Sequence, residues 1–155
     1  NKKDVDIKIE DGISSKKFEV KDSENFDINS IKRHEAPKIE DQDQQFIDIP
    51  LIKIAYGRSG DKGNKANIGI IARNEKFYPV ICKYLTEDIV KRCFSKFLEG
   101  EVEKFYLPGS CSINFMLDNV LGGGGPASLR NDPQGKAYAQ ILLDETIPVP
   151  KSLLE

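Results

Sequence analysis

Two segments of the sequence combine glycine with fixed charge. The first, residues 57–64, reads Gly-Arg-Ser-Gly-Asp-Lys-Gly-Asn, and the second holds four consecutive glycines at residues 122–125, with Arg130 shortly after them. Glycine lets backbone N–H groups approach a ligand closely, and successive N–H groups in a turn can form a concavity that attracts anions. Because an arginine adds a full charge, the pattern predicts a small anionic ligand, or an acidic partner, held between the two glycine segments.

The side chains that could hold such a ligand are cations, amides and hydroxyls. Arginine can bind phosphate or carboxylate through two parallel hydrogen bonds, lysine acts as a point charge, and asparagine can orient a carbonyl group. The predicted ligand-binding residues are Arg58, Ser59, Asp61, Lys62, Asn64, Asn67, Gly123, Gly124 and Arg130, with Lys136 and Asn114 as further candidates.

Two carboxylates are the candidates for proton transfer. Asp61 lies inside the first glycine segment, and Asp132 begins an Asp-Pro-Gln-Gly sequence that is typical of a type I turn. Either could serve as a general base if its neighbours tune its pKa. The alternative for each is structural: Asp61 would be a solvated turn residue, and Asp132 would hydrogen-bond its own turn.

Several kinds of site are disfavoured by the residues present. His34 is the only histidine and lies near the N-terminus, so a Ser-His-Asp or Cys-His site in the later part would need this segment to fold back. Cys82, Cys93 and Cys111 form no CxxC pair, and we expect no metal site and no cofactor. Neither glycine segment fits a P-loop, and the first is not a convincing dinucleotide-binding fingerprint because a strand is predicted after it.

The composition indicates one domain of ordinary size. The chain has 155 residues, of which 39% are hydrophobic and 31% charged, and its formal net charge is −2. The cations are scattered, which argues against nucleic acid, and no apolar run reaches the length of a membrane span. The odd number of unpaired thiols favours a reducing intracellular compartment, the mitochondrial matrix or otherwise the cytoplasm.

Residues 1–50 are predicted to form an extended polar arm. They carry 9 Lys or Arg and 13 Asp or Glu, whereas residues 51–155 carry 14 and 12. Short alternations, at Val5, Ile7 and Ile9 and again at Phe18 and Val20, could support edge strands. Because the arm has too little apolar surface to fold alone, we expect it to contact a protein partner or another copy of the chain. The alternative is that it packs back on its own domain.

Residues 51–155 are predicted to form a compact α+β domain. Strands are expected at 51–56, 67–73, 102–107 and 136–147, and helices at 77–85, 86–99 and 112–121. Thr86 is expected to cap the second of these helices and Gly100 to end it. The economical arrangement is a four-stranded, mainly antiparallel sheet with the helices packed on one face.

A series of motifs in this part resembles one known family. Residues 56–64 and 66–73, the Ser-Ile-Asn-Phe-Met-Leu run at 112–117, the four glycines, and residues 128–130 and 132–137 look like the signature of the AtuA-like domain, the C-terminal domain of acyclic terpene utilisation proteins. The resemblance covers about residues 51–150. It implies a ferredoxin-like fold and an association with the breakdown of acyclic terpenoids, whose acids are processed as CoA thioesters. Longer members carry a large domain at the place where this sequence has the arm.

Three functions follow from these observations. The first is a non-catalytic AtuA-like module, an accessory subunit attached through the arm, which binds a small anion between the glycine segments. The second is an enzyme of hydratase or lyase type acting on an acyl-CoA or a related acid. The third is an accessory subunit of a large mitochondrial complex whose ligand site has decayed. The first two depend on Arg58 and Arg130 lying in one pocket.

Overall fold

The computed structural model describes residues 7–10, 12, 14–18, 27–39 and 45–155, which fall in two units, residues 1–32 and 33–155. In the first unit, strand β1 (Ile7–Glu10) pairs in antiparallel register with β2 (Ser15–Phe18). This hairpin agrees with the alternation expected around Ile7 and Ile9. Val5 and Val20, which belong to the same prediction, lie outside the described residues.

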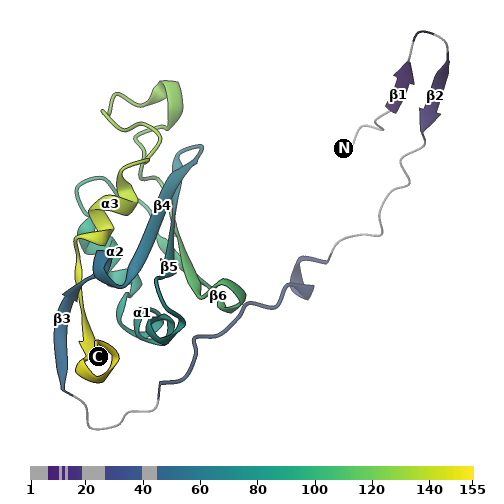
Figure 1. Cartoon of the computed structure of the whole chain (residues 1–155). Coiled ribbons are helices and arrows are strands. Elements are labelled where there is room, and N and C mark those ends of the chain that lie inside the picture. The colour runs from purple at the N-terminus through teal and green to yellow at the C-terminus, as the bar shows by residue number, and fades with distance from the viewer. Residues whose placement is uncertain (1–6, 11, 13, 19–26, 40–44) are drawn as a thin grey trace. The chain divides into compact units, whose positions relative to one another are not determined.

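The second unit contains a four-stranded antiparallel sheet in the order β4-β5-β7-β6 (Figure 1). Its strands are β4 (Ala55–Lys62), β5 (Lys65–Ala72), β6 (Val102–Leu107) and β7 (Ser112–Leu117). The helices are α1 (Tyr78–Tyr84), α2 (Glu87–Cys93) and α3 (Tyr138–Leu143). The predicted fold class, a ferredoxin-like α+β domain with a four-stranded antiparallel sheet, is confirmed.

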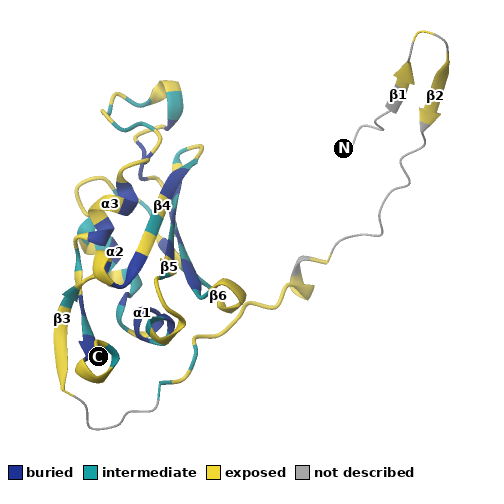
Figure 2. Cartoon of the chain, in the orientation of Figure 1, coloured by how far each residue is buried: buried dark blue, intermediate teal, exposed yellow. Residues whose placement is uncertain are grey.

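One face of the sheet carries the core, and we call it the helix-covered face. Strand alternation points residues 66, 68 and 70 of β5 and residues 113, 115 and 117 of β7 to this face, and all six side chains are buried. Helix α3 contacts β4 and β5, α1 contacts β5, and α2 contacts β6. The opposite, open face carries Arg58, Gly69 and Asn114 side by side in register. Figure 2 shows that β4 carries both buried and exposed residues.

Two strands form a second, smaller antiparallel sheet of this unit. Strand β3 (Phe46–Pro50) pairs in antiparallel register with β8 (Thr146–Pro150). Strand β3 lies inside the segment that the sequence assigned to the arm, and Ile147 and Val149 of β8 belong to the buried core. Short 3-10 turns occupy Ile28–Ser30, Leu51–Lys53, Glu75–Phe77, Pro108–Ser110, Gly125–Ala127 and Lys151–Leu153.

The first glycine segment is a strand and not the loop that its composition suggested. Residues 57–62 continue β4 in unbroken pairing with β5, and within residues 57–64 only Gly63 has a left-handed backbone, with φ of 68°. Gly57 is needed for packing, because a Cβ there would lie 3.0 Å from Leu143 and 3.2 Å from Ala139 of α3. Close approach of the helix, rather than a turn, explains this glycine.

Two further elements also differ from the sequence prediction. Residues 112–117 form β7 and not a helix, because their apolar residues also fit a period of two, which pairing with β5 and β6 selects. Residues 138–143 form α3 and not a strand, and only residues 146–150 are extended. Helix α2 is capped by Thr86 as expected, but it ends at Cys93 rather than at Gly100.

Candidate functional site

Strand alternation divides the first glycine segment between the two faces of the sheet. Arg58, Gly60 and Lys62 take open-face positions, since they pair across from Gly69, Asn67 and Lys65 of β5. Ser59 and Asp61 take helix-covered positions on the same strand. Because β4 is an edge strand, side chains from the segment before α3 can reach around it to the open face.

These open-face residues line a hollow that we call the cationic pocket. It has a volume of about 350 Å³. Its lining residues are Arg58, Ser59, Gly60, Lys62, Asn67, Gly69 and Lys136. Three of the seven are cations and none is a carboxylate. Lys136 closes one side, since its Nζ would lie 3.1 Å from a Cβ placed at Gly60.

A buried serine holds the Lys136 side of this pocket to the sheet. Ser59 Oγ donates to the carbonyl oxygen of Lys136 over 3.1 Å and accepts from the backbone N–H of Ala139 over 2.9 Å. Only 7% of Ser59 is exposed, so both bonds are protected from water. Ser59 therefore positions the chain that carries Lys136, which is a different role from direct ligand contact.

Two other lining residues are held by hydrogen bonds. The Asn67 side-chain amide donates to Asn114 Oδ1 over 3.2 Å, which fixes the orientation of the Asn67 amide plane on the open face. Lys62 Nζ donates to the carbonyl oxygen of Asp61 over 2.9 Å. The Asp61 side chain takes the helix-covered side of β4 and does not line the cationic pocket.

The two glycine segments meet through Asn64. Its Oδ1 accepts from the backbone N–H of Gly123 over 2.7 Å, and its Nδ2 donates to Asn119 Oδ1 over 3.0 Å. Its carbonyl oxygen accepts from the N–H of Val120 over 3.1 Å. Gly124 packs so closely on Gly63 that any side chain there would overlap the Gly63 carbonyl group. The two glycine segments are therefore in direct contact at the place where a bound ligand was predicted.

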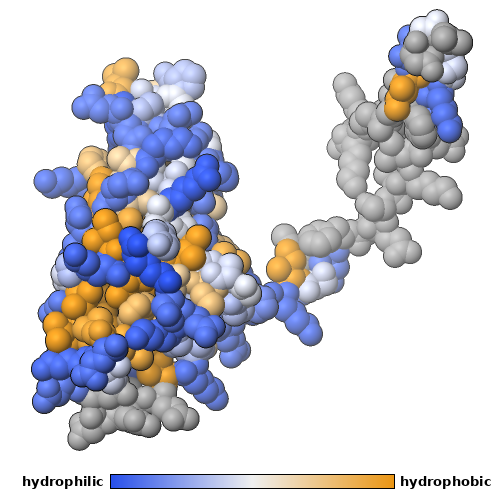
Figure 3. All heavy atoms as spheres, in the orientation of Figure 1, coloured by the Kyte–Doolittle hydropathy of each residue, from blue (hydrophilic) through white to orange (hydrophobic). Residues whose placement is uncertain are grey.

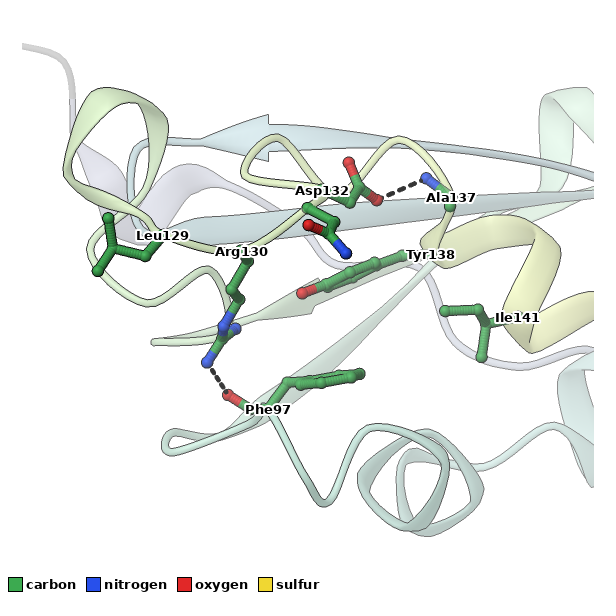
Figure 4. A pocket seen from close by; sticks show the side chains of 8 residues that line it. Phe97, Leu129, Arg130, Asp132, Ala137, Tyr138 and Ile141 are labelled. Carbon is green, nitrogen blue, oxygen red and sulfur yellow. Dashed lines mark hydrogen bonds between the residues drawn. The ribbon is translucent and has the colours of Figure 1, made fainter.

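Arg130 belongs to a second hollow, which we call the aromatic pocket (Figure 4). It has a volume of about 410 Å³. Its lining residues are Phe97, Leu129, Arg130, Asn131, Asp132, Ala137, Tyr138 and Ile141. Leu129, at the rim, is fully exposed and points away from the other labelled side chains.

The polar side chains of Arg130 and Tyr138 hydrogen-bond backbone carbonyl groups of the protein. The Arg130 guanidinium donates to the carbonyl oxygens of Val120 and Phe97 and lies 5.3 Å from the centre of the Phe97 ring. Tyr138 donates its hydroxyl to Val120 O over 3.0 Å and stacks on Phe94 at 4.9 Å between ring centres. Burial raises the pKa of Tyr138, and the hydrogen bond with Arg130 acts in the opposite direction.

Asp132 hydrogen-bonds the chain that follows it. Its two carboxylate oxygens accept from the N–H groups of Lys136 and Ala137 over 2.9 and 2.8 Å (Figure 4). The structure therefore places Arg58 in the cationic pocket and Arg130 and Asp132 in the aromatic pocket. The expectation that Arg58 and Arg130 share one pocket is not met, because strand register directs the first to the open face while backbone carbonyls hold the second.

A half-buried lysine that the site prediction did not include, Lys104, lies under α1. Lys104 Nζ donates to the carbonyl oxygens of Cys82 and Leu85, over 2.7 and 2.6 Å, at the C-terminal end of the helix. Burial lowers the pKa of Lys104 and raises that of the Cys82 thiol. The sequence signal was present: within the strand expected at residues 102–107, Lys104 lies two residues from both Val102 and Tyr106 and therefore shares their face. The hydrogen bonds indicate a structural role as a helix cap.

Figure 3 shows hydrophilic side chains beside apolar ones over the visible face of residues 33–155. Within the part of the chain that the structure describes, no three His, Cys, Asp or Glu side chains gather where they could hold a metal ion. Nor does any helix among the described residues have the length and apolarity needed to cross a bilayer.

The fold and the pocket define a ferredoxin-like α+β domain with a cation-lined hollow on the open face of its sheet. The family model of the AtuA ferredoxin-like domain matches residues 49–148. The chain therefore belongs to the AtuA ferredoxin-like domain family, which confirms the resemblance read from the motifs. No curated protein and no solved structure matches it.

Proposed function

We propose that this chain is a non-catalytic AtuA-like module that serves as an accessory part of a larger assembly and binds a small anionic group. Because Arg58 and Arg130 do not share a pocket, we place that group in the cationic pocket rather than between the two glycine segments. One observation carries the proposal: Arg58, Lys62 and Lys136 line the same hollow with no carboxylate among its lining residues. Three positive charges brought together without a counter-charge repel one another, and a bound anion relieves that repulsion.

The position of the candidate acids favours binding over proton transfer. Asp61 does not line the cationic pocket, and both carboxylate oxygens of Asp132 accept backbone hydrogen bonds beside the aromatic pocket. A general base must reach the proton that it removes, and neither carboxylate lines the hollow in which we place the anion. An enzyme acting on an acyl-CoA is thus the second candidate, and the family's link with terpenoid acids is its support.

The larger assembly is proposed from the N-terminal part of the chain. Residues 1–32 form a unit of their own, with the β1-β2 hairpin as its regular structure, and the sequence of residues 1–50 is acidic. A short hairpin can pair with a strand of a partner through its free edge. The presence of three cations in one hollow favours a working site over the decayed site of a mitochondrial accessory subunit.

Anion binding is tested by thermal unfolding of the full chain with inorganic phosphate, acetate or CoA. We expect a concentration-dependent rise in Tm for the wild type, since a ligand that binds only the folded state stabilises it. The Arg58→Gln/Lys136→Met variant should lose this rise. The matched control is Lys53→Met/Lys96→Met, which removes the same charge at two exposed sites outside the pocket.

The result has two clear readings. Loss of the rise in the pocket variant with retention in the control supports the pocket as the anion site. Equal behaviour of the two variants, or no rise with any of the three anions, contradicts it. For the assembly, light scattering during size-exclusion chromatography of the full chain should show a species larger than one chain, and a strict monomer counts against association with copies of itself.

A further inference from the structure

The charges of the cationic pocket point to the chemical class of its ligand. Resting on the proposed function, we infer that the bound group is a phosphoryl dianion, such as a phosphate monoester, rather than a carboxylate. Arg58 and Lys62 come from β4, and Lys136 comes from the turn before α3, so the three cations approach from two separate parts of the chain. Interaction energy scales with the product of the charges, so a dianion gains about twice as much as a monoanion.

The geometry of the donors agrees with this class. A phosphoryl group offers three equivalent oxygens, whereas a carboxylate offers two in one plane. Arginine binds two of the phosphoryl oxygens in parallel, and lysine binds as a point charge from a flexible stem. One arginine and two lysines can therefore share the three oxygens, while a carboxylate leaves at least one of the cations without a partner.

The carboxylates on the same face already have other partners. Asp118 pairs with Lys65 at 3.2 Å, and Glu103 pairs with Arg33 at 3.3 Å. No ion pair joins any of the three pocket cations to a carboxylate among the residues that the structure describes. The positive charge of the pocket is thus left for a ligand rather than neutralised inside the protein.

Gly69 supplies the room for the ligand. A Cβ at this position would have as its nearest neighbours the Arg58 carbonyl at 3.8 Å and Asn114 Oδ1 at 3.9 Å, which are ordinary contacts. Its φ is not in the left-handed region, so neither packing nor backbone conformation requires a glycine. The missing side chain leaves open floor between Arg58 and Asn67, where a ligand can come close to the backbone.

The test compares three anions by isothermal titration of the full chain at constant ionic strength, at pH 5.5 and 7.5. Methyl phosphate changes from monoanion to dianion with a second pKa of about 6, so its affinity should rise roughly fourfold between the two pH values. Sulfate, a dianion throughout, and acetate should change little. At pH 7.5 methyl phosphate should bind about tenfold more tightly than acetate. The lining contains no histidine and no carboxylic acid, so we assign the pH dependence to the ligand.

A variant that keeps the fold adds a steric test. Gly69→Ala should lower the affinity for methyl phosphate about fivefold while leaving the Tm without ligand unchanged. Gly109→Ala is the matched control, because a Cβ there meets nothing within 4 Å and Gly109 lies outside the pocket.

The outcomes separate the inference from the proposed function. Acetate binding as tightly as methyl phosphate, or methyl phosphate binding equally well at both pH values, overturns the phosphoryl assignment and leaves anion binding in place. No binding of any of the three anions overturns the proposed function itself. If Gly69→Ala leaves the affinity for methyl phosphate unchanged, the phosphoryl group does not lie next to Gly69. That result overturns its assignment to this pocket.

Discussion

The side-chain oxygen of Asn64 accepts a hydrogen bond from the backbone N–H of Gly123 over 2.7 Å. This bond joins the turn between β4 and β5 to the run of four glycines, nearly sixty residues later in the chain. The glycine run therefore packs against the β4-β5 hairpin and is not an open loop between which and the hairpin a ligand could bind. Its contribution is to the tertiary structure, and none of its four glycines lines either pocket.

Replacement of this asparagine should loosen the contact. Asn64→Ala removes two side-chain hydrogen bonds, those with Gly123 and Asn119, and should lower the free energy of unfolding by about 1–3 kcal/mol. Urea denaturation measures the loss, and hydrogen exchange at the Gly123 amide should become faster. Asn131→Ala, at an exposed residue, is the control. Unchanged exchange at Gly123 in the Asn64→Ala protein would show that the bond does not protect this amide.

Gly124 should tolerate no side chain. Its backbone is left-handed, with φ of 74°, and a Cβ there would lie 2.6 Å from the carbonyl carbon of Gly63. Gly124→Ala should therefore destabilise the protein by on the order of 2 kcal/mol or more. Gly125→Ala separates strain from overlap, because Gly125 is also left-handed but has nothing within 4 Å of its Cβ position. Equal losses in the two variants would argue against the overlap with Gly63.

Ser59 should couple stability to anion binding. Ser59→Ala leaves the buried N–H of Ala139 without its acceptor and should cost about 1–3 kcal/mol in the free energy of unfolding. The same change frees the chain at Lys136, so the affinity for phosphate should fall as well. Ser95→Ala, at an exposed position, is the control for both measurements. A stable variant with normal phosphate affinity would contradict the positioning role.

The thiol of Cys93 should make the stability pH-dependent in the alkaline range. Burial, with a smaller contribution from Glu145, raises the pKa of this thiol from 9.0 to about 11. A raised folded-state pKa contributes stability that is present below pH 9 and is lost as the pH rises towards 11. The wild type should thus lose more stability between pH 8 and 10.5 than Cys93→Ala does, as measured by urea denaturation. Parallel curves for the two proteins would refute the assignment to Cys93.

Some strands and helix ends could be predicted from the pattern of neighbouring residues in the sequence. The ferredoxin-like class was implied by the resemblance of the family motifs. The alternation of residues 67–73 and 102–107 and the capping of α2 by Thr86 predicted individual elements of an α+β domain. Each of these signals is contained within a few neighbouring residues. The helix predicted over residues 112–117 was wrong for the same reason. Ile113, Met116 and Leu117 fit a helical period, Ile113, Phe115 and Leu117 fit a strand, and only the pairing with β5 and β6 decides between them.

The sequence by itself determined which chemical groups the protein has: cations, amides and glycines, with a single histidine, and these groups are the basis of our proposal of an anionic ligand. Tertiary structure alone decided where those groups lie. The register of β4 turned Arg58 and Lys62 to the open face, and the Ser59 bonds brought Lys136 beside them, whereas carbonyl groups drew Arg130 into another pocket. The physical reason is that residue type fixes charge and hydrogen-bonding capacity locally, while the meeting of residues far apart in the chain depends on strand register and core packing.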